Sequence, residues 1–116
     1  MNRSWEANYA RILKYNKIEF EYEPKQFNFT FKKNNYSYIP DFKVDDKWFE
    51  VKGWLTKSDL ETIYAFKQTY KNEELEVIES IKYFELYELY KDKIKLETTT
   101  VTPQIKTKVV GITFWK

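Results

Sequence analysis

Two acidic residues and a lysine near the middle of the chain have the types and the spacing of a catalytic site. The stretch 38–53, YIPDFKVDDKWFEVKG, consists of two short segments rich in β-branched and aromatic residues around a polar break at 45–46. This pattern is typical of a β-hairpin. If 45–46 form a two-residue turn, Asp41 lies directly opposite Glu50. Lys52 then lies beside Glu50 on the same face, because side chains two apart share a face of a strand.

The facing carboxylates predict a metal site. Like charges directly opposite each other on a sheet are destabilising, and a hard divalent cation, which takes carboxylate and carbonyl oxygens as ligands, removes that repulsion. The chain has no histidine and no cysteine, which excludes histidine-based triads, thiol chemistry and zinc–thiolate sites. We therefore expect Mg²⁺, with Mn²⁺ as a substitute, rather than zinc. The opposite face of the hairpin, with Phe42, Phe49 and Val51, should point towards a core.

A third carboxylate lies near the N-terminus. Ser4 is a good N-cap, and apolar residues recur at helical spacing to about Tyr15, which predicts a helix with Glu6 in its first turn. Glu6 has two interpretations. It can stabilise the positive end of the helix dipole, which is the commoner role, or it can point towards the hairpin as a further ligand.

The remaining pattern predicts an α/β fold. The order is a helix, two or three antiparallel strands, a helix, a strand and a helix, which indicates a mixed sheet flanked by helices. A break at 98–103 and a strand at 109–115 should follow, either on the sheet edge or against a second subunit. The expected intermediate elements are strands at 18–22 and 27–31, a polar turn at 32–35, a helix capped by Thr56 or Ser58 and running to about Lys71, a strand around 75–78 and a helix at 81–91.

Size and composition restrict the class of protein. A chain of 116 residues is expected to form one domain with its own core. The net charge is +2 with 33% charged residues, so lysines either solvate the surface or, interleaved with aromatic residues, form a local basic face. There is no apolar signal core and no apolar run approaching the ~20 residues that span a bilayer. We expect a soluble protein with no membrane partner, located in the cytoplasm, or in the host cytoplasm if phage-encoded.

The central motif resembles a known signature. Pro40-Asp41, eight residues, then Glu50-Val51-Lys52 resembles the signature of the PD-(D/E)xK nuclease superfamily. The stretches RSWE (3–6), IEFEYE (18–23), YIPDF (38–42) and EVKGW (50–54) resemble those of phage endonuclease I-type Holliday junction resolvases. The resemblance covers about residues 3–92. It implies a restriction-endonuclease-like αβββαβα core over residues 1–93, with 94–116 as a C-terminal strand extension on the core or at a dimer interface.

The resemblance also implies roles for individual residues. Asp41 and Glu50 would be metal ligands with the Val51 backbone carbonyl as a third, and Glu6 would complete the site directly or through water. Lys52 would orient the attacking water and favour its deprotonation. The implied reaction is Mg²⁺-dependent hydrolysis of a DNA phosphodiester by in-line attack.

The substrate is less strongly indicated than the chemistry. Arg3, Lys25 and Lys57 flank the motifs and could bind phosphates, although each alone is more often a solvated surface charge. No helix-turn-helix or zinc finger accompanies the core, so base readout lacks an obvious element. We therefore expect recognition of DNA shape or branch geometry. Because resolution of a junction requires two cuts, we also expect a homodimer.

Three hypotheses follow for the function. The first is a metal-dependent endonuclease that acts on branched DNA during phage recombination. The second is a transposition or restriction-type endonuclease of the same superfamily that depends on a partner for specificity. The third is a DNA-binding protein that has the fold without activity. The intact set of Glu6, Asp41, Glu50 and Lys52 argues against the third, because opposed carboxylates have no structural benefit without a metal.

Overall fold

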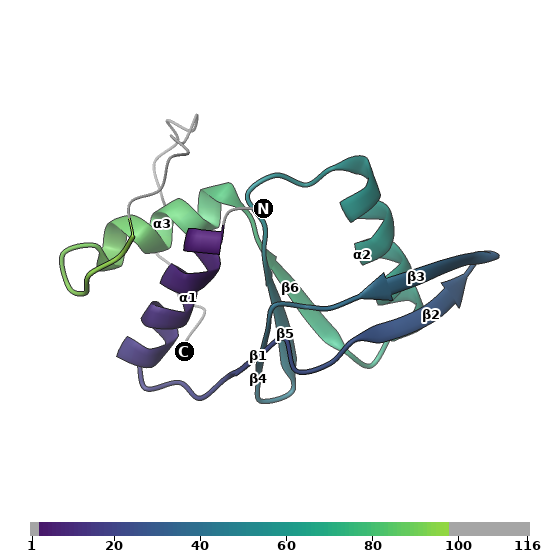
Figure 1. Cartoon of the computed structure of the whole chain (residues 1–116), viewed down its shortest axis with the longest axis horizontal. Coiled ribbons are helices and arrows are strands. Elements are labelled where there is room, and N and C mark those ends of the chain that lie inside the picture. The colour runs from purple at the N-terminus through teal and green to yellow at the C-terminus, as the bar shows by residue number, and fades with distance from the viewer. Residues whose placement is uncertain (1–2, 98–116) are drawn as a thin grey trace.

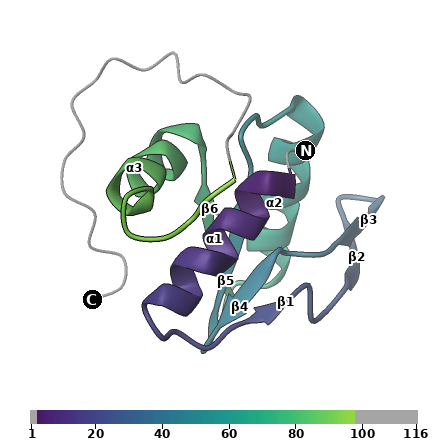
Figure 2. The same ribbon diagram turned by 60° about the vertical axis from the view of Figure 1, so that its left-hand side comes forward.

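A mixed α/β fold is formed by residues 3–97, the part of the chain that the computed structural model describes. A four-stranded sheet stands between α1 and α3 on one side and α2 on the other (Figures 1 and 2). A separate two-stranded ribbon lies next to α2. The elements are α1 (Arg3–Tyr15), β1 (Glu21–Tyr22), β2 (Phe27–Phe31), β3 (Asn34–Tyr38), β4 (Phe42–Val44), β5 (Lys47–Val51), α2 (Lys57–Thr69), β6 (Glu74–Ile78) and α3 (Ser80–Tyr90).

The sheet is mixed, as the sequence predicts. Its strand order is β1-β4-β5-β6, with antiparallel pairing of β1 with β4 and of β4 with β5, and parallel pairing of β5 with β6. The parallel step is possible because the α2 crossover returns the chain to the start of the sheet. Among residues 3–97, no helix is long and apolar enough to cross a membrane.

The predicted hairpin register is confirmed. Phe42 pairs with Phe49, and Val44 with Lys47, around the turn at 45–46. Asp45 has a φ of 53°, in the left-handed region that tight hairpin turns require. One step beyond the last pair, Asp41 is opposite Glu50.

Two hydrophobic clusters cover the two faces of the sheet. Alternation along β5 sends Phe49 and Val51 into the cluster formed with α1 and α3, as expected from the pattern, whereas Trp48 enters the cluster formed with Phe27 and Phe66 beneath α2. Each face of the sheet is therefore covered by a different part of the chain. Glu50, between Phe49 and Val51 in β5, lies on the same α2-facing side as Trp48.

The strands before the hairpin differ from the prediction. The polar stretch 32–35 was expected only to lead into the central hairpin. Instead Lys32 and Lys33, with φ of 50° and 68°, form a tight turn between β2 and β3. The strand β3 was missed because its asparagines and serine weaken the apolar alternation. Five strands precede α2, where two or three were expected.

Two boundaries also differ. The strand expected at 18–22 is reduced to Glu21–Tyr22, which pairs with β4 at two positions, while Ile18 and Phe20 still pack on the core. Ser4 is not the N-cap of the first helix, because α1 already includes Arg3.

The later elements agree with the prediction. Thr56 caps α2 in a capping box, in which its hydroxyl accepts from the Asp59 backbone N–H and the Asp59 carboxylate accepts from the Thr56 N–H. The strand β6 and the helix α3 lie within a residue or so of their predicted positions.

The first residues of the expected C-terminal extension pack on the core. Ile94 and Leu96 contact the α1–α3 cluster. The Glu97 backbone N–H donates to Asn8 Oδ1 at 2.8 Å, and Asn8 Nδ2 donates to the Glu97 carbonyl at 2.9 Å. The predicted break at 98–103 and strand at 109–115 lie outside the described residues.

Gly53 allows a close approach between the end of the hairpin and α1. A Cβ at Gly53 would lie 2.8 Å from an atom of the Trp5 ring. The Trp5 ring is buried and stacks on Tyr83 at a centroid distance of 4.1 Å, so it has little room to move. Gly53 is therefore required by packing.

We predict that Gly53→Ala lowers the free energy of unfolding by about 1–3 kcal/mol through overpacking against Trp5. Urea unfolding followed by circular dichroism measures this. The matched control is Trp54→Ala, because Trp54 is 66% exposed and its loss should change stability by less than about 0.5 kcal/mol. Equal unfolding midpoints for Gly53→Ala and the unaltered protein would contradict the packing argument.

Candidate active site

Three carboxylates from different elements converge at one end of the sheet. Glu6 from α1, Glu23 after β1 and Asp41 before β4 each offer an oxygen, and these oxygens lie within 4.8 Å of one another. Glu6 is 6% exposed and Asp41 3% exposed, whereas Glu23 is exposed. This cluster could hold a metal ion, because hard cations bind several carboxylate oxygens at once.

The pairing of β1 with β4 brings Glu23 to the cluster. Tyr22 pairs with Phe42, so continuing the antiparallel register by one residue places Glu23 opposite Asp41. The Glu23 backbone N–H donates to the Asp41 carbonyl at 2.8 Å. Glu23 has a φ of 47°, which turns the chain away from the sheet after this contact.

Glu50 is the fourth acid of the site. It is 7% exposed and lies across the hairpin from Asp41. The Tyr38 hydroxyl donates to Glu50 Oε1 at 2.9 Å, and the Val51 backbone N–H donates to Asp41 Oδ2 at 2.8 Å. These two hydrogen bonds hold the facing carboxylates in defined positions.

The two facing acids, Asp41 and Glu50, resist ionisation because the pKa of each is raised. Burial raises the pKa of Asp41, and the negative charge of Glu50 raises it further, although the hydrogen bond from Val51 opposes this. Burial also raises the pKa of Glu50, opposed by the Tyr38 hydroxyl and the positive charge of Lys52. Since the interacting carboxyls share their titration, protons or a cation are needed to stabilise the pair at neutral pH.

Glu6 also has a hydroxyl partner. The Tyr22 hydroxyl donates to Glu6 Oε1 at 2.5 Å. The position of Glu6 in the acidic cluster therefore favours its role in the site over a purely helix-stabilising one. A pocket of about 430 Å³, lined by Glu6, Tyr22, Phe20 and Phe42 among others, opens beside this hydrogen bond.

Lys52 lies near both Glu50 and Asp59 of α2. Its Nζ is 3.5 Å from Asp59 Oδ1, and its charge lowers the pKa of Glu50. Lys52, Glu50, Tyr38 and Asp59 line a pocket of about 220 Å³ between β5 and α2. The lysine thus lies near Glu50 and is linked through Asp59 to the capping box of α2.

The expected phosphate-binding residues lie apart from these contacts. Lys25 is exposed, with Nζ 4.7 Å from the centroid of the Phe27 ring, and Lys57 is exposed at the first position of α2. Among residues 3–97, no ion pair or hydrogen bond joins either lysine to the acidic cluster. Arg3 is the first residue of α1, and its side chain lies outside the described part of the structure.

Sequence reasoning missed Glu23 and Tyr38. Glu23 continues the acidic alternation at 19 and 21, which indicates a solvated edge, and only the register of β1 with β4 shows that it meets Asp41. Tyr38 was expected at the start of the central hairpin, but it is the last residue of β3, and the hairpin strand β4 begins only at Phe42.

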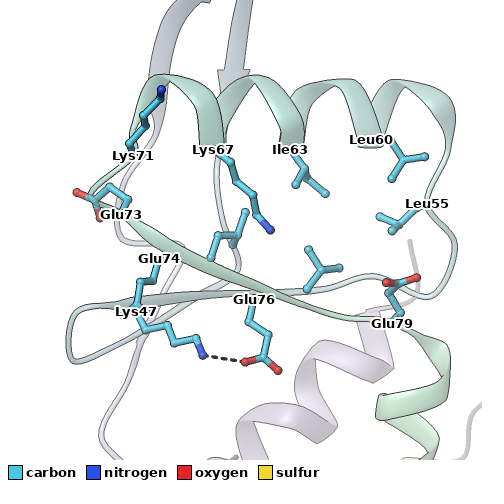
Figure 3. A pocket seen from close by; sticks show the side chains of 12 residues that line it. Lys47, Leu55, Leu60, Ile63, Lys67, Lys71, Glu73, Glu74, Glu76 and Glu79 are labelled. Atoms are coloured by element: carbon cyan, nitrogen blue, oxygen red, sulfur yellow. Dashed lines mark hydrogen bonds and ion pairs between the residues drawn. The ribbon is translucent and has the colours of Figure 1, made fainter.

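A larger pocket lies away from the acidic cluster. It has a volume of about 770 Å³ and lies between α2 and β6 (Figure 3). Lys67 of α2 points into it towards β6, and Lys47 is paired with Glu76 of β6 at 2.8 Å. None of Glu6, Glu23, Asp41 and Glu50 lines this pocket.

Comparison of the chain with known protein families, with curated proteins and with solved structures finds no significant match. Its function is therefore inferred from the residues and the geometry of the site.

We predict that removing the Glu23 carboxylate weakens metal binding. Glu23→Gln should raise the dissociation constant for Mn²⁺ by about tenfold or more, the range typical for loss of a group that supports a metal site. Isothermal titration calorimetry measures it. Glu21→Gln is the matched control, because Glu21 is also exposed on β1 but pairs with Lys43. Equal loss in both variants would show a general effect of charge.

We also predict that metal-free protein becomes less stable as pH rises. Because the pKa values of Asp41 and Glu50 are raised in the folded state, the folded protein holds protons that the unfolded chain has released. The free energy of unfolding should therefore fall from about pH 4, near the ordinary pKa of a carboxyl, towards neutral pH.

Urea unfolding in chelator at a series of pH values tests this expectation. Glu50→Gln should flatten the slope, because it removes one titrating group and the repulsion of Asp41. Glu61→Gln, an exposed change on α2, should leave the slope as it is. An unchanged slope in Glu50→Gln would mean that the facing carboxylates do not govern this pH dependence.

Proposed function

We propose that the protein is a metal-dependent DNA endonuclease with a restriction-endonuclease-like core of the PD-(D/E)xK type. The observation that carries the proposal is the buried pair of Asp41 and Glu50, opposed across a hairpin and placed beside Lys52. In this arrangement two carboxylates that repel each other are buried, and the positively charged Lys52 follows Glu50 by two residues. Such a combination is typical of functional sites, where pKa values are strongly perturbed.

The donor set fits a hard divalent cation. The acidic cluster supplies oxygens only, two of its members are buried, and the chain has no histidine or cysteine. These features suit Mg²⁺ or Mn²⁺ better than zinc. Asp41, Glu6 and Glu23 would hold the ion, with Glu50 and the Val51 carbonyl on the facing strand. A cation bound there supplies an activated water and positive charge next to the phosphoryl oxygens.

The chain's own residues define the rest of the proposed reaction. Lys52 lies beside Glu50 and would orient the attacking water and favour its loss of a proton. Asp59, 3.5 Å from the lysine, restrains the Lys52 ammonium group. Tyr38 holds Glu50, and Tyr22 holds Glu6, so the carboxylates are oriented before the DNA binds.

We assign branched DNA, such as a Holliday junction, as the substrate. The assignment is supported by the resemblance of four separate stretches to phage junction resolvases. A homodimer would supply one site for each of the two strands that must be cut.

We predict that Mg²⁺ supports paired nicking of a labelled four-way junction and that chelator abolishes it. Glu50→Gln should remove detectable cleavage because it takes away a carboxylate of the cluster. Lys52→Met should lower the cleavage rate by about 100-fold or more, the usual loss when a group that assists proton transfer is removed. Glu61→Gln, exposed on α2, is the control and should cleave at the unaltered rate.

The alternative functions give different results in the same assay. Cleavage of plain duplex at a fixed sequence would replace the junction assignment with a restriction-type enzyme. Tight DNA binding without cleavage in Mg²⁺ or Mn²⁺ would contradict the enzymatic proposal.

A further inference from the structure

The β2–β3 ribbon has two chemically different faces. Its inner face carries the aromatic side chains at 27, 29, 31, 36 and 38, which are buried or half-buried. Its outer face carries two directly opposed pairs, Asn28 with Ser37 and Thr30 with Asn35, and all four residues are exposed. None of these outer residues is charged, although 33% of the chain is.

The outer face is built for hydrogen bonding. Thr30 Oγ1 donates to Asn35 Oδ1 at 2.7 Å, and Gln26 Nε2 donates to both Asn28 Oδ1 and Ser37 Oγ, at 3.1 Å and 2.7 Å. Each asparagine amide has two donors and two acceptor lone pairs. These contacts therefore order the amides while leaving most of their hydrogen-bonding capacity directed outwards.

The inner face holds the ribbon rigidly on α2. The Phe27 ring packs edge-on against Phe66 and Tyr70, at centroid distances of 4.9 and 5.0 Å. Near the tip, Phe31 meets Tyr64 at 5.9 Å. Figure 1 shows α2 alongside the ribbon on one side, with no other labelled element covering the opposite side.

The ribbon begins at the active site and ends in lysines. At one end Tyr38 donates its hydroxyl to Glu50, and at the other end Lys32 and Lys33 form the exposed turn. Five residues at about 3.3 Å each make the ribbon about 17 Å long, which matches about five base-pair steps of 3.4 Å. The tip lysines could then contact phosphates while the strands lie along a groove.

We propose that the β2–β3 ribbon enters the major groove of the duplex next to the scissile phosphate, where Asn28 and Asn35 contact base edges. A two-stranded ribbon fits the major groove, and asparagine pairs with adenine through two hydrogen bonds. The inference rests on the proposed function and extends it, because it assigns a base-reading element to an enzyme otherwise selective for DNA shape. The base preference would fall within about five base pairs of the cut.

A protein partner fits this surface less well. Protein interfaces are enriched in aromatic residues, methionine and arginine at their centre, and the outer face has amides and hydroxyls instead. The lysines at the tip complement the phosphate backbone.

The test uses the full chain and four-way junctions whose arms carry randomised base pairs beside the exchange point. Sequencing of junctions bound by Glu50→Gln protein without metal reports binding preference, and sequencing of junctions cut by the unaltered protein with Mg²⁺ reports cleavage preference. We expect adenine to be favoured by about 5- to 150-fold at one or two positions. Asn28→Ala with Asn35→Ala should remove this preference.

A variant that prefers a different base, instead of losing its base preference, cannot be explained by misfolding. Asn35→Asp should shift the choice at its position from adenine to cytosine, because a carboxylate accepts from the cytosine amino group. Lys32→Ala with Lys33→Ala should weaken binding to all sequences alike and reduce the salt dependence by about one phosphate contact per lysine. Thermal unfolding of each variant checks that the fold is kept.

The outcomes separate this inference from the proposed function. Cleavage without base preference, or with a preference that the asparagine variants do not alter, would contradict base reading by the ribbon. The proposed endonuclease activity would still be supported. A bound-pool preference that depends on Asn28 and Asn35 without any cleavage would support the ribbon and contradict the endonuclease. A change of oligomeric state in the asparagine variants, with DNA binding unchanged, would assign the face to a second copy of the chain and overturn the inference.

Discussion

The opposition of Asp41 and Glu50 across the β4–β5 hairpin is the constraint on which the rest of the structure depends. Both carboxyls are buried, and burial is the largest cause of the raised pKa of each. A fold keeps such a pair only if neighbouring groups compensate for the lost solvation and the repulsion. Here a hydroxyl, a backbone N–H and a lysine supply part of that compensation, and a bound cation would supply the remainder.

The helix α2 connects the chemistry to the ribbon. Asp59 in its first turn completes the capping box with Thr56 and restrains Lys52, while Phe66 in its C-terminal half packs against the aromatic face of β2 and β3. The lysine, the tyrosine that holds Glu50 and the outward amides are therefore parts of one packed unit.

Local patterns were sufficient for some of these features and insufficient for others. The register of the central hairpin followed from alternation around a polar pair, because a one-residue slip would reverse every side chain. The strand β3 was missed because its outer positions are polar and its aromatic residues are too few to show a period. The same polar residues that hid the strand are the ones that face outwards from the ribbon.

The sequence by itself determined the chemistry available to this protein: carboxylates and a lysine at hairpin spacing, with no histidine or cysteine to offer another route. These conclusions depend only on residue types and on the two-residue period of a strand. The tertiary structure alone decided that Glu23 joins the cluster, that Tyr38 orients Glu50 and that β2 and β3 leave the main sheet to pack on α2. Each of these contacts joins elements distant along the chain or depends on which strands pair, and no local pattern specifies such pairing.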